Sequence, residues 1–401
     1  MNNISKLTAI ATCLHVADQI ALVGVPLVAV LVFQASPELL GILVACQSLA
    51  HLLGTLPFGV MVDRFPLRNL IVLAAFFSLF GFGVATIGLV TQNILGFGTG
   101  VTAAGFGVVL FGLTALSIIP KIVSPDDLSK SNATIELPRT AASFAVPLFV
   151  AAILTANNSG YIFAAAALTA VFAIGITTTL PNFQNQKLKR RNPLSELLEG
   201  GDFVLRSPHL RAIALCAVFW NLAFTALLVV LVPLLATHYQ ASPNAFGTAL
   251  AAFGLGAILG TSFARQFASK VAPKLLLVFG PAVSVFAALL LYVGPNTGST
   301  LVVFAAFALL GFGPSIWLIT QNTIRQTIAP PQILGRVNAV IQTTIYGMRP
   351  LGAVIGGVVT GTFSAQAGLL VVIGLFILSA IATSLGGLRK IENFADLRPA
   401  S

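Results

Sequence analysis

The placement of basic residues constrains this fold more than any other feature of the sequence. Of its 21 Lys and Arg residues, all except Arg139 and Arg349 fall in short polar stretches between long apolar segments. Each apolar segment has the roughly 20 residues needed to cross a bilayer core. The sequence therefore predicts twelve transmembrane helices, at roughly 7–33, 38–61, 69–91, 94–119, 133–157, 159–181, 212–236, 243–264, 273–294, 299–324, 336–361 and 366–388.

The basic residues are confined to alternate connecting stretches. The other turns, near residues 35, 92, 158, 240, 296 and 364, contain no Lys or Arg. Because basic loops stay on the cytoplasmic side, we expect a multi-pass protein of the inner membrane with both termini in the cytoplasm. A soluble domain has about a quarter of its residues charged, and this chain has 8%. The topology bias also accounts for the net charge of +10, so we expect no nucleic-acid partner.

A polar segment divides the chain into two halves. We expect an N-terminal bundle over 1–181, a cytoplasmic linker over 182–211, and a C-terminal bundle with a short cytoplasmic tail over 212–401. The linker opens with the basic run Lys187–Arg191 and continues with leucines alternating with acidic residues. This pattern is compatible with an amphipathic helix on the inner membrane surface, or with a solvated linker that only restrains the two bundles.

The two halves repeat each other. The pattern Pro125-x-x-Leu-x-Lys-x-Asn-Ala recurs as Pro331-x-x-Leu-x-Arg-x-Asn-Ala, 206 positions later. Gly59-x-x-x-Asp-Arg is echoed by Gly260-x-x-x-Ala-Arg in the same topological position. Parallel repeats of this kind characterise one large transporter architecture, in which the substrate binds between the halves. We expect an all-α membrane protein with two pseudo-symmetric six-helix bundles.

The segment after the second apolar span carries a specific resemblance. Gly59-Val-Met-Val-Asp63-Arg64-Phe-Pro-Leu-Arg68 resembles the signature loop of the major facilitator superfamily, although Pro66 and Leu67 depart from the usual pattern. The resemblance implies that Gly59, Asp63, Arg64 and Arg68 form a latch that closes the cytoplasmic face. A carboxylate there can cap a neighbouring helix while the arginines hold partners. The competing interpretation is that Arg64 and Arg68 only obey the positive-inside rule.

A second resemblance lies near the eleventh span. The stretch from Arg325-Gln326 through Pro330-Pro331 to Leu334-Gly-Arg-Val-Asn338, followed by Pro350-Leu-Gly352 and Gly356-Gly357, is similar to the branch with enterobactin-type siderophore exporters and macrolide efflux proteins. It implies export of a bulky amphipathic or anionic molecule, siderophore or drug-like, and thus a role in multidrug resistance or siderophore export. An importer or uniporter of a small metabolite on the same fold is the alternative.

Two acidic residues inside the spans are candidates for proton coupling. Asp18 lies on a stripe with Thr8, Thr12 and His15, at helical spacing on an otherwise apolar segment. An ionisable group in a span is functional by default, so Asp18 is the leading proton carrier of an antiporter. The alternative is a structural carboxylate. Glu136 and Arg139 are three residues apart and can pair, either at the inner gate or at the substrate.

Arg349 is the strongest candidate for contact with an anionic group on the cargo. Gln342, Tyr346 and Arg349 share one face of the eleventh span, which contains no acidic residue. Its counter-ion must come from another helix, from the substrate, or from the cytoplasmic side. The family resemblance implies that the seventh and tenth spans line the central cavity. It thereby adds Asn221, Trp317 and Gln321 to the candidate substrate site. Arg139 is a further candidate for that site.

Catalysis has no motif to support it in this sequence. Neither a GxxxxGK[ST] loop nor an HExxH pair is present, and the three cysteines lie apart within spans without a CxxC. We therefore expect neither an enzyme nor an ATP-driven transporter, and no metal or cofactor. The proton gradient is the expected energy source, and the expected partners are protons, a small-molecule substrate and the lipid bilayer around a monomer.

Overall fold

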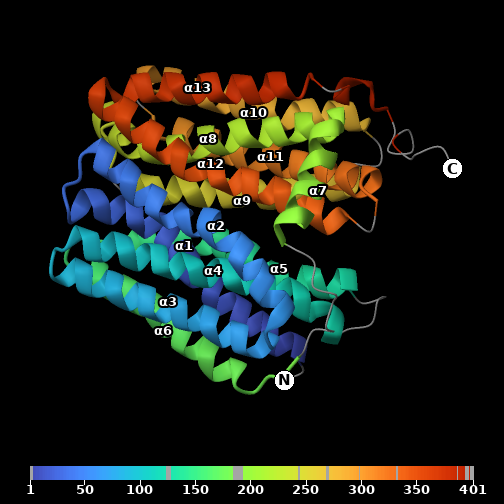
Figure 1. Ribbon diagram of the computed structural model, residues 1–401. Coiled ribbons are helices and arrows are strands. Elements are labelled where there is room, and N and C mark those ends of the chain that lie inside the picture. Colours follow the sequence, from blue (N-terminus) through green and yellow to red (C-terminus); the bar gives the residue numbers. More distant parts are fainter. Residues whose placement is uncertain are drawn as a thin grey trace. The chain divides into compact units, whose positions relative to one another are not determined.

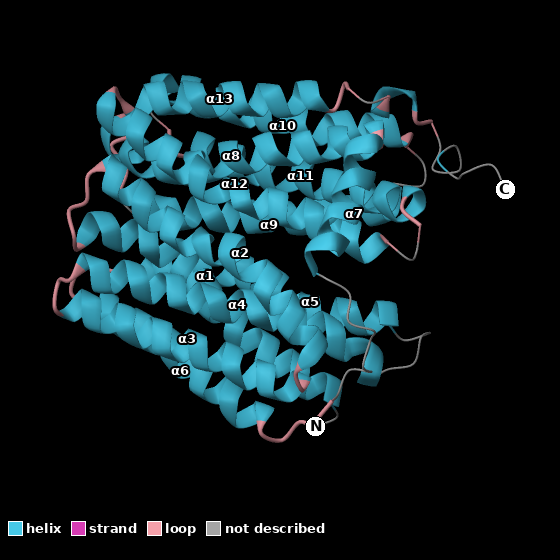
Figure 2. Ribbon diagram, viewed as in Figure 1, coloured by secondary structure: helices cyan, strands magenta, loops and turns pink. Residues whose placement is uncertain are grey.

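The protein is described here by a computed structural model in which helices form nearly all of the described part of the chain (Figure 1). The structure describes residues 3–122, 128–183, 193–242, 244–267, 271–297, 299–330, 333–385, 387–392 and 397. Within these ranges there is no β-strand (Figure 2). The chain divides into two compact units, Met1–Arg190 and Arg191–Ser401.

The first unit contains six long helices. They are α1 (Asn3–Leu31), α2 (Pro37–Arg64), α3 (Leu67–Val90), α4 (Ile94–Ile122), α5 (Leu128–Ile153) and α6 (Ser159–Thr177). Short turns join most of them, and local chemistry sets where they begin. At the start of α2, Pro37 occupies the first turn and the Ser36 hydroxyl accepts a hydrogen bond from the Leu39 N–H at 3.4 Å. Both are standard helix-start devices.

The second unit repeats this arrangement and adds a short helix before it. Its helices are α7 (Pro193–Arg206), α8 (Pro208–Thr237), α9 (Asn244–Phe267), α10 (Pro273–Val293), α11 (Leu301–Ile328), α12 (Leu334–Thr362) and α13 (Ala365–Ala382), with 3-10 turns at Gly294–Thr297 and Leu388–Lys390. Every predicted span coincides with one long helix, which confirms the predicted fold class.

Ten of the described helices are long and apolar enough to cross a membrane by length and composition. The two remaining long helices are α5 and α12, the fifth of each six-helix set. Arg139 lies within α5, whose apolar part is Pro138–Ile153. Arg336 and Arg349 lie within α12. Both of these helices therefore carry basic residues within their length.

Helix packing reproduces the sequence repeat. In the first unit α3 packs on α4 and α6, α2 on α4, and α1 on α5 and α6. In the second unit the equivalent pairs are in contact: α10 with α11 and α13, α9 with α11, and α8 with α12 and α13. Each half is therefore the same bundle, built twice in the same chain order.

The repeat extends to the backbone of single turns. Gln34 after α1 and Gln240 after α8 both have positive φ, of 46° and 48°. In each case the N–H of the next residue bonds to a carbonyl six positions earlier in the helix: the Ala35 N–H donates to Ala29 O at 2.8 Å, and the Ala241 N–H to Leu235 O at 3.0 Å. This bond is one residue wider than the corresponding bond of the Schellman motif. The paired glutamines are 206 positions apart, the same offset as the first sequence motif.

Glycines set the closest helix contacts in the first unit. A Cβ added to Gly81 on α3 would lie 2.2 Å from Ala104 N, and one added to Gly100 on α4 would lie 2.4 Å from Ala85 N. These distances leave no room for any side chain, because the two backbones themselves touch. Small residues at helix interfaces allow this approach in membrane proteins.

Candidate functional site

The side chain of Arg349 is held by two residues inside the second unit. Its Nε donates a hydrogen bond of 2.9 Å to Asn221 Oδ1 on α8, and its Cζ lies 4.6 Å from the centre of the Tyr346 ring. Asn221 is buried, and its Nδ2 donates to Ala217 O at 2.9 Å, which fixes the amide with its oxygen toward the arginine. The guanidinium thus contacts the Asn221 amide along one edge and the Tyr346 ring with one face.

Two glycines bring α12 close enough to α8 for this contact. A Cβ on Gly352 would lie 2.3 Å from Thr225 Oγ1 and 2.4 Å from Leu222 O, and one on Gly356 would lie 2.7 Å from Ala226 O. Gly352 follows Arg349 by less than one helical turn. The close approach of the backbones therefore places the arginine beside Asn221.

The first unit has a related polar group between its equivalent helices. His15 on α1 interacts electrostatically with Arg139 on α5. His15 and Asn221 are 206 positions apart, so they occupy the same place in the repeat. Each half thus sets an arginine of its fifth helix against a polar side chain of its first helix. The Glu136 side chain lies outside the described residues, so its predicted pairing with Arg139 stays a prediction.

Asp18 lies one turn further along α1, on the same face as His15. Its side chain is half-buried, and the other stripe residues, Thr8 and Thr12, bond their hydroxyls to carbonyls of their own helix. Arg139 is exposed. The structure therefore places one acid, one imidazole and one guanidinium on facing helices of the first unit.

The predicted latch lies where α2 gives way to α3. α2 ends at Arg64, and α3 begins at Leu67, whose N–H donates to Phe183 O at 2.9 Å. Arg64 is exposed and Arg68 is half-buried. A Cβ on Gly59 would meet nothing within 4 Å, unlike its repeat partner Gly260, where a Cβ would lie 2.2 Å from Phe312 O. The Asp63 side chain lies outside the described residues, so the latch stays a prediction.

The sequence interpretation misplaced Arg325, which it grouped with the basic residues of a connecting stretch. The structure places Arg325 within α11, with only 7% of the residue exposed. It extends a face already noted in the sequence, because Trp317, Gln321 and Arg325 follow one another at intervals of four. Hydropathy alone missed it because Arg325 ends the apolar stretch Leu301–Arg325.

The candidate substrate residues therefore form two groups in the second unit. Asn221, Tyr346 and Arg349 are in direct contact, whereas Trp317 and Gln321 lie along α11 with Arg325. Gln342 is exposed and does not join either group through any described contact. Nowhere in the described ranges do three His, Cys, Asp or Glu side chains come together as metal ligands would.

Helix α7 docks on α12 rather than standing alone. Val204 is buried in a cluster with Leu210, Val337 and Ile341, and the Glu199 carboxylate accepts a hydrogen bond of 2.5 Å from Arg336 Nη1. Leu198 and Leu205 are each 65% exposed, so α7 still presents an apolar face. The basic run Lys187–Arg191 lies outside the described residues, and contact of this face with lipid stays a prediction.

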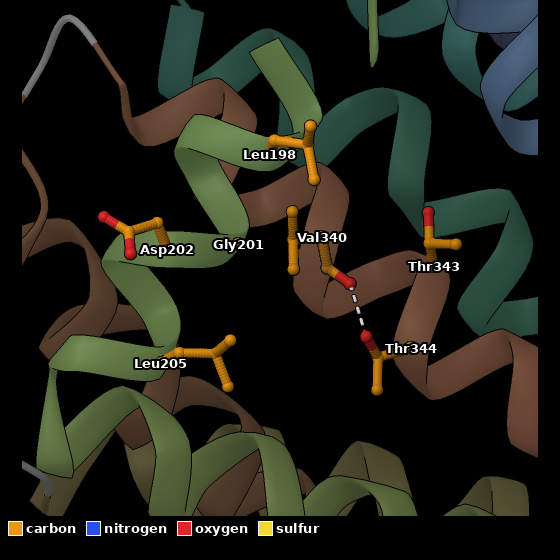
Figure 3. Close-up of a pocket in the computed structure, with 7 residues that line it drawn as sticks. All are labelled: Leu198, Gly201, Asp202, Leu205, Val340, Thr343 and Thr344. Carbon is orange, nitrogen blue, oxygen red and sulfur yellow. Dashed lines mark hydrogen bonds between the residues drawn. The ribbon is translucent and has the colours of Figure 1, made fainter. Parts of the chain in front are cut away.

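A groove of about 380 Å³ lies between α7 and α12. Figure 3 shows Leu198 and Leu205 on the α7 side, across from residues of α12. The Thr344 hydroxyl is turned back to donate to Val340 O at 2.8 Å, and Asp202 pairs with Arg206 at 2.8 Å. These two polar groups are thus engaged within their own helices, whereas Thr343 Oγ1 has no hydrogen-bond partner among the described residues. The groove shares no lining residue with the Arg349 group: it is formed by Leu198, Gly201, Asp202, Leu205, Val340, Thr343 and Thr344.

The docking of α7 can be tested with two adjacent glycines. A Cβ on Gly200 would lie 2.8 Å from the Arg336 backbone, whereas one on Gly201 would meet nothing within 4 Å. We expect Gly200→Val to push α7 off α12 at a cost of about 1–3 kcal/mol, and Gly201→Val to leave it docked. The measurement is the rate of tryptic cleavage after Arg206, followed by mass spectrometry. Equal rates in the two variants would show that this contact does not hold α7.

The sequence matches the family description "Major Facilitator Superfamily" over residues 7–353 and 213–393. Among curated relatives, the chain is 28% identical over 365 residues to an enterobactin exporter EntS from Salmonella choleraesuis strain SC-B67, covering 88% of this chain and 85% of the relative. It is 26% identical over 351 residues to an enterobactin exporter EntS from Escherichia coli O1:K1 / APEC, covering 83% and 81%.

Solved structures with the same fold are more distant in sequence. The nucleoside transporter NupG superposes with a TM-score of 0.76 at 12% identity, covering 96% of this chain and 98% of that one. An inward-facing, unoccupied bacterial homologue of the lysosomal transporter Spinster gives 0.74 at 16%, covering 99% and 98%. A D-xylose–proton symporter gives 0.71 at 15%, covering 95% and 96%.

Proposed function

Because the chain belongs to the major facilitator superfamily, a family of transporters rather than enzymes, we propose that it exports a bulky anionic or amphipathic molecule of the siderophore or drug-like class. The observation that carries the proposal is the held guanidinium of Arg349 inside α12, in a chain related over most of its length to enterobactin exporters. The energy source in this proposal is proton exchange, and the substrate moves by alternating access.

The chemistry of the Arg349 group favours an anionic or strongly hydrogen-bonding cargo. A cation placed within a membrane-spanning helix is costly, and such groups mark substrate or ion sites. A cationic cargo would be repelled by a desolvated guanidinium, so a cavity for lipophilic cations is not expected to keep one. The two contacts described for the arginine, Asn221 and Tyr346, are both with side chains that are uncharged at neutral pH.

Reconstituted transport tests both cargo and coupling. The purified protein is placed in vesicles with an imposed proton gradient, and movement of enterobactin is followed with and without the gradient. We expect gradient-driven movement in the export direction, and loss of gradient dependence in Asp18→Asn, because the amide cannot carry a proton. Thr12→Val serves as the matched control on the same helix face, because the Thr12 hydroxyl bonds to Thr8 O of its own helix. Enterobactin movement that ignores both the gradient and Asp18→Asn would contradict proton exchange.

The alternative function is import or uniport of a small metabolite. The D-xylose–proton symporter shares the fold, and a shared fold does not specify direction. Uptake of enterobactin in the same vesicles, or movement of sugars or nucleosides in its place, would favour this alternative.

The latch at the end of α2 is proposed as the gate on the cytoplasmic face. We expect Asp63→Ala to reduce transport about tenfold while expression stays near that of the parent, since loss of one charge-assisted contact costs about 1.5–3 kcal/mol. Asp63→Asn keeps the size of the side chain and separates charge from packing. Parent-like transport in Asp63→Ala would remove this residue from the gate.

The topology we propose has both termini and the linker in the cytoplasm and the helices in the inner membrane. The support is the absence of Lys and Arg from the opposite turns. A single cysteine at position 187, in a variant without the three native cysteines, should resist an impermeant thiol reagent in intact cells. Labelling of that cysteine before lysis would reverse the orientation.

A further inference from the structure

One face of α11 carries three polar side chains that are buried and incompletely bonded. Trp317, Gln321 and Arg325 are 8%, 2% and 7% exposed. Trp317 Nε1, Gln321 Oε1 and Arg325 Nε each lack a hydrogen-bond partner among the described residues. Such groups are rare in native interiors, and each costs about 1–3 kcal/mol when left unpaired.

The hydrogen bonds that Gln321 and Arg325 make determine which of their polar atoms stay unpaired. Gln321 Nε2 donates to Asn322 Oδ1 at 2.7 Å, and Arg325 Nη2 donates to the same oxygen. Since a shared acceptor needs a donor on each side, the glutamine amide is oriented with its oxygen away from Asn322. The remaining set is therefore two donors, on Trp317 and Arg325, with one acceptor, on Gln321, between them.

The charge of Arg325 is also uncompensated within the part of the chain that the structure describes. Its described partners are the neutral Asn322 amide and Tyr346, with which it interacts electrostatically. Burying a charge without a counter-ion is unfavourable unless a partner arrives in another state. Because Tyr346 also stacks on Arg349, one tyrosine contacts the cations of both groups.

We propose that Trp317, Gln321 and Arg325 form a second binding site, which recognises an anionic group carrying a neighbouring hydroxyl on the exported molecule. This inference rests on the proposed export function and names the chemistry of its cargo. In the order of the side chains along α11, the anionic group accepts from Arg325, and the hydroxyl donates to Gln321 Oε1 and accepts from Trp317 Nε1. A hydroxylated aromatic acid has both groups side by side.

The three side chains are buried in this conformation, so the site is closed. Their unpaired polar atoms favour a state in which a ligand can reach them. A ligand shifts a conformational equilibrium only through its different affinity for the two states. Here the closed state leaves three polar atoms unbonded, so a ligand that bonds them favours an open state of the second unit. Occupancy of the site is thereby coupled to the motion that transport requires.

Trp317 itself reports on this site. The chain has two tryptophans, and the other, Trp220, donates to Ser284 Oγ at 3.0 Å and stacks on Phe224. In Trp220→Phe, the fluorescence lifetime of Trp317 is measured in nanodiscs as salicylate is added. Salicylamide, which lacks the anion, and 2-methoxybenzoate, which lacks the hydroxyl donor, are the comparison probes.

We expect a saturable lifetime change with salicylate and responses about tenfold weaker or more with either comparison probe, as for a lost charged hydrogen bond. Arg325→Gln should weaken salicylate binding to a similar degree, Arg325→Lys should weaken it less, and the control Arg336→Gln should leave it unchanged. Arg336 is a suitable control because it loses the same charge but pairs with Glu199 of α7.

Two outcomes would overturn the site. They are the absence of a saturable response to salicylate in the parent, and an equal response in Arg325→Gln and the parent. Thermal unfolding of each variant, followed by Tyr and Trp absorbance, identifies any that fails to fold, and Arg325→Lys then carries the test. A saturable, Arg325-dependent response in a protein that does not export enterobactin would keep the site and reject the proposed cargo.

Discussion

Gly81→Ala is expected to destroy the packing of the first unit. The new Cβ would lie 2.2 Å from Ala104 N and 2.6 Å from Gly100 O, which are backbone atoms of α4. Backbone cannot rotate away as a side chain can, so α3 and α4 must separate along their contact. Overpacking typically costs about 1–3 kcal/mol, and a backbone clash places this variant at or above the upper end.

The measurement is the thermal unfolding of the detergent-purified protein, with size-exclusion chromatography to detect aggregation. Gly83→Ala is the matched control, because it lies two residues further along the same helix and its Cβ would meet nothing within 4 Å. We expect the control to match or exceed the parent in stability, since alanine favours helix by about 1 kcal/mol over glycine. Similar unfolding temperatures for the two variants would show that α3 and α4 do not touch as described.

Arg349→Gln is expected to remove transport of anionic cargo and to spare transport of neutral amphipathic compounds. Charged hydrogen bonds contribute about 1.5–3 kcal/mol, so the loss should be about ten- to a hundredfold in kcat/KM. Arg349→Lys keeps the charge but not the edge that Asn221 binds, and should retain part of the activity. An equal loss for every compound would indicate gating or proton coupling instead.

Asn221 offers a sharper version of this test. Asn221→Asp would place a carboxylate on Arg349 Nε, where the amide oxygen now accepts at 2.9 Å. The added negative charge would repel an anionic group, so transport of anionic cargo should be lost even though the arginine remains. Asn221→Leu removes the contact without adding a charge. If Leu proves at least as harmful as Asp for anionic cargo, Asn221 acts through packing and not through the charge of Arg349.

The sequence predicted the helices well because a bilayer imposes length and apolarity on each of them. The discrepancies lie at ends where polar residues continue a helix. For example, α5 begins at Leu128 although the predicted span begins near residue 133. Hydropathy detects only the apolar part of such a helix, whereas backbone hydrogen bonding continues through Ser and Asn.

The candidate site was less accessible to sequence reasoning. The spacing of Tyr346 and Arg349 predicted a shared face, and their cation–π contact lies on one helix. The bond from Arg349 to Asn221 joins residues 128 positions apart, and only the packing of α8 on α12 creates it. Arg325 was missed for a related reason, since its burial depends on neighbouring helices and not on its own segment.

Helix α12 carries both the docking contact for α7 and the arginine of the candidate substrate site. Arg336 holds α7 at one end and Arg349 lies in the candidate site 13 positions later, with no proline between them. At 1.5 Å per residue this is a stiff rod of about 20 Å. A dye attached to the exposed face of α7 should therefore move with Arg349, the arginine that we propose contacts cargo. Helix α12 would transmit a movement of Arg349 to α7. The dye on α7 would then report substrate occupancy optically, from outside the bilayer.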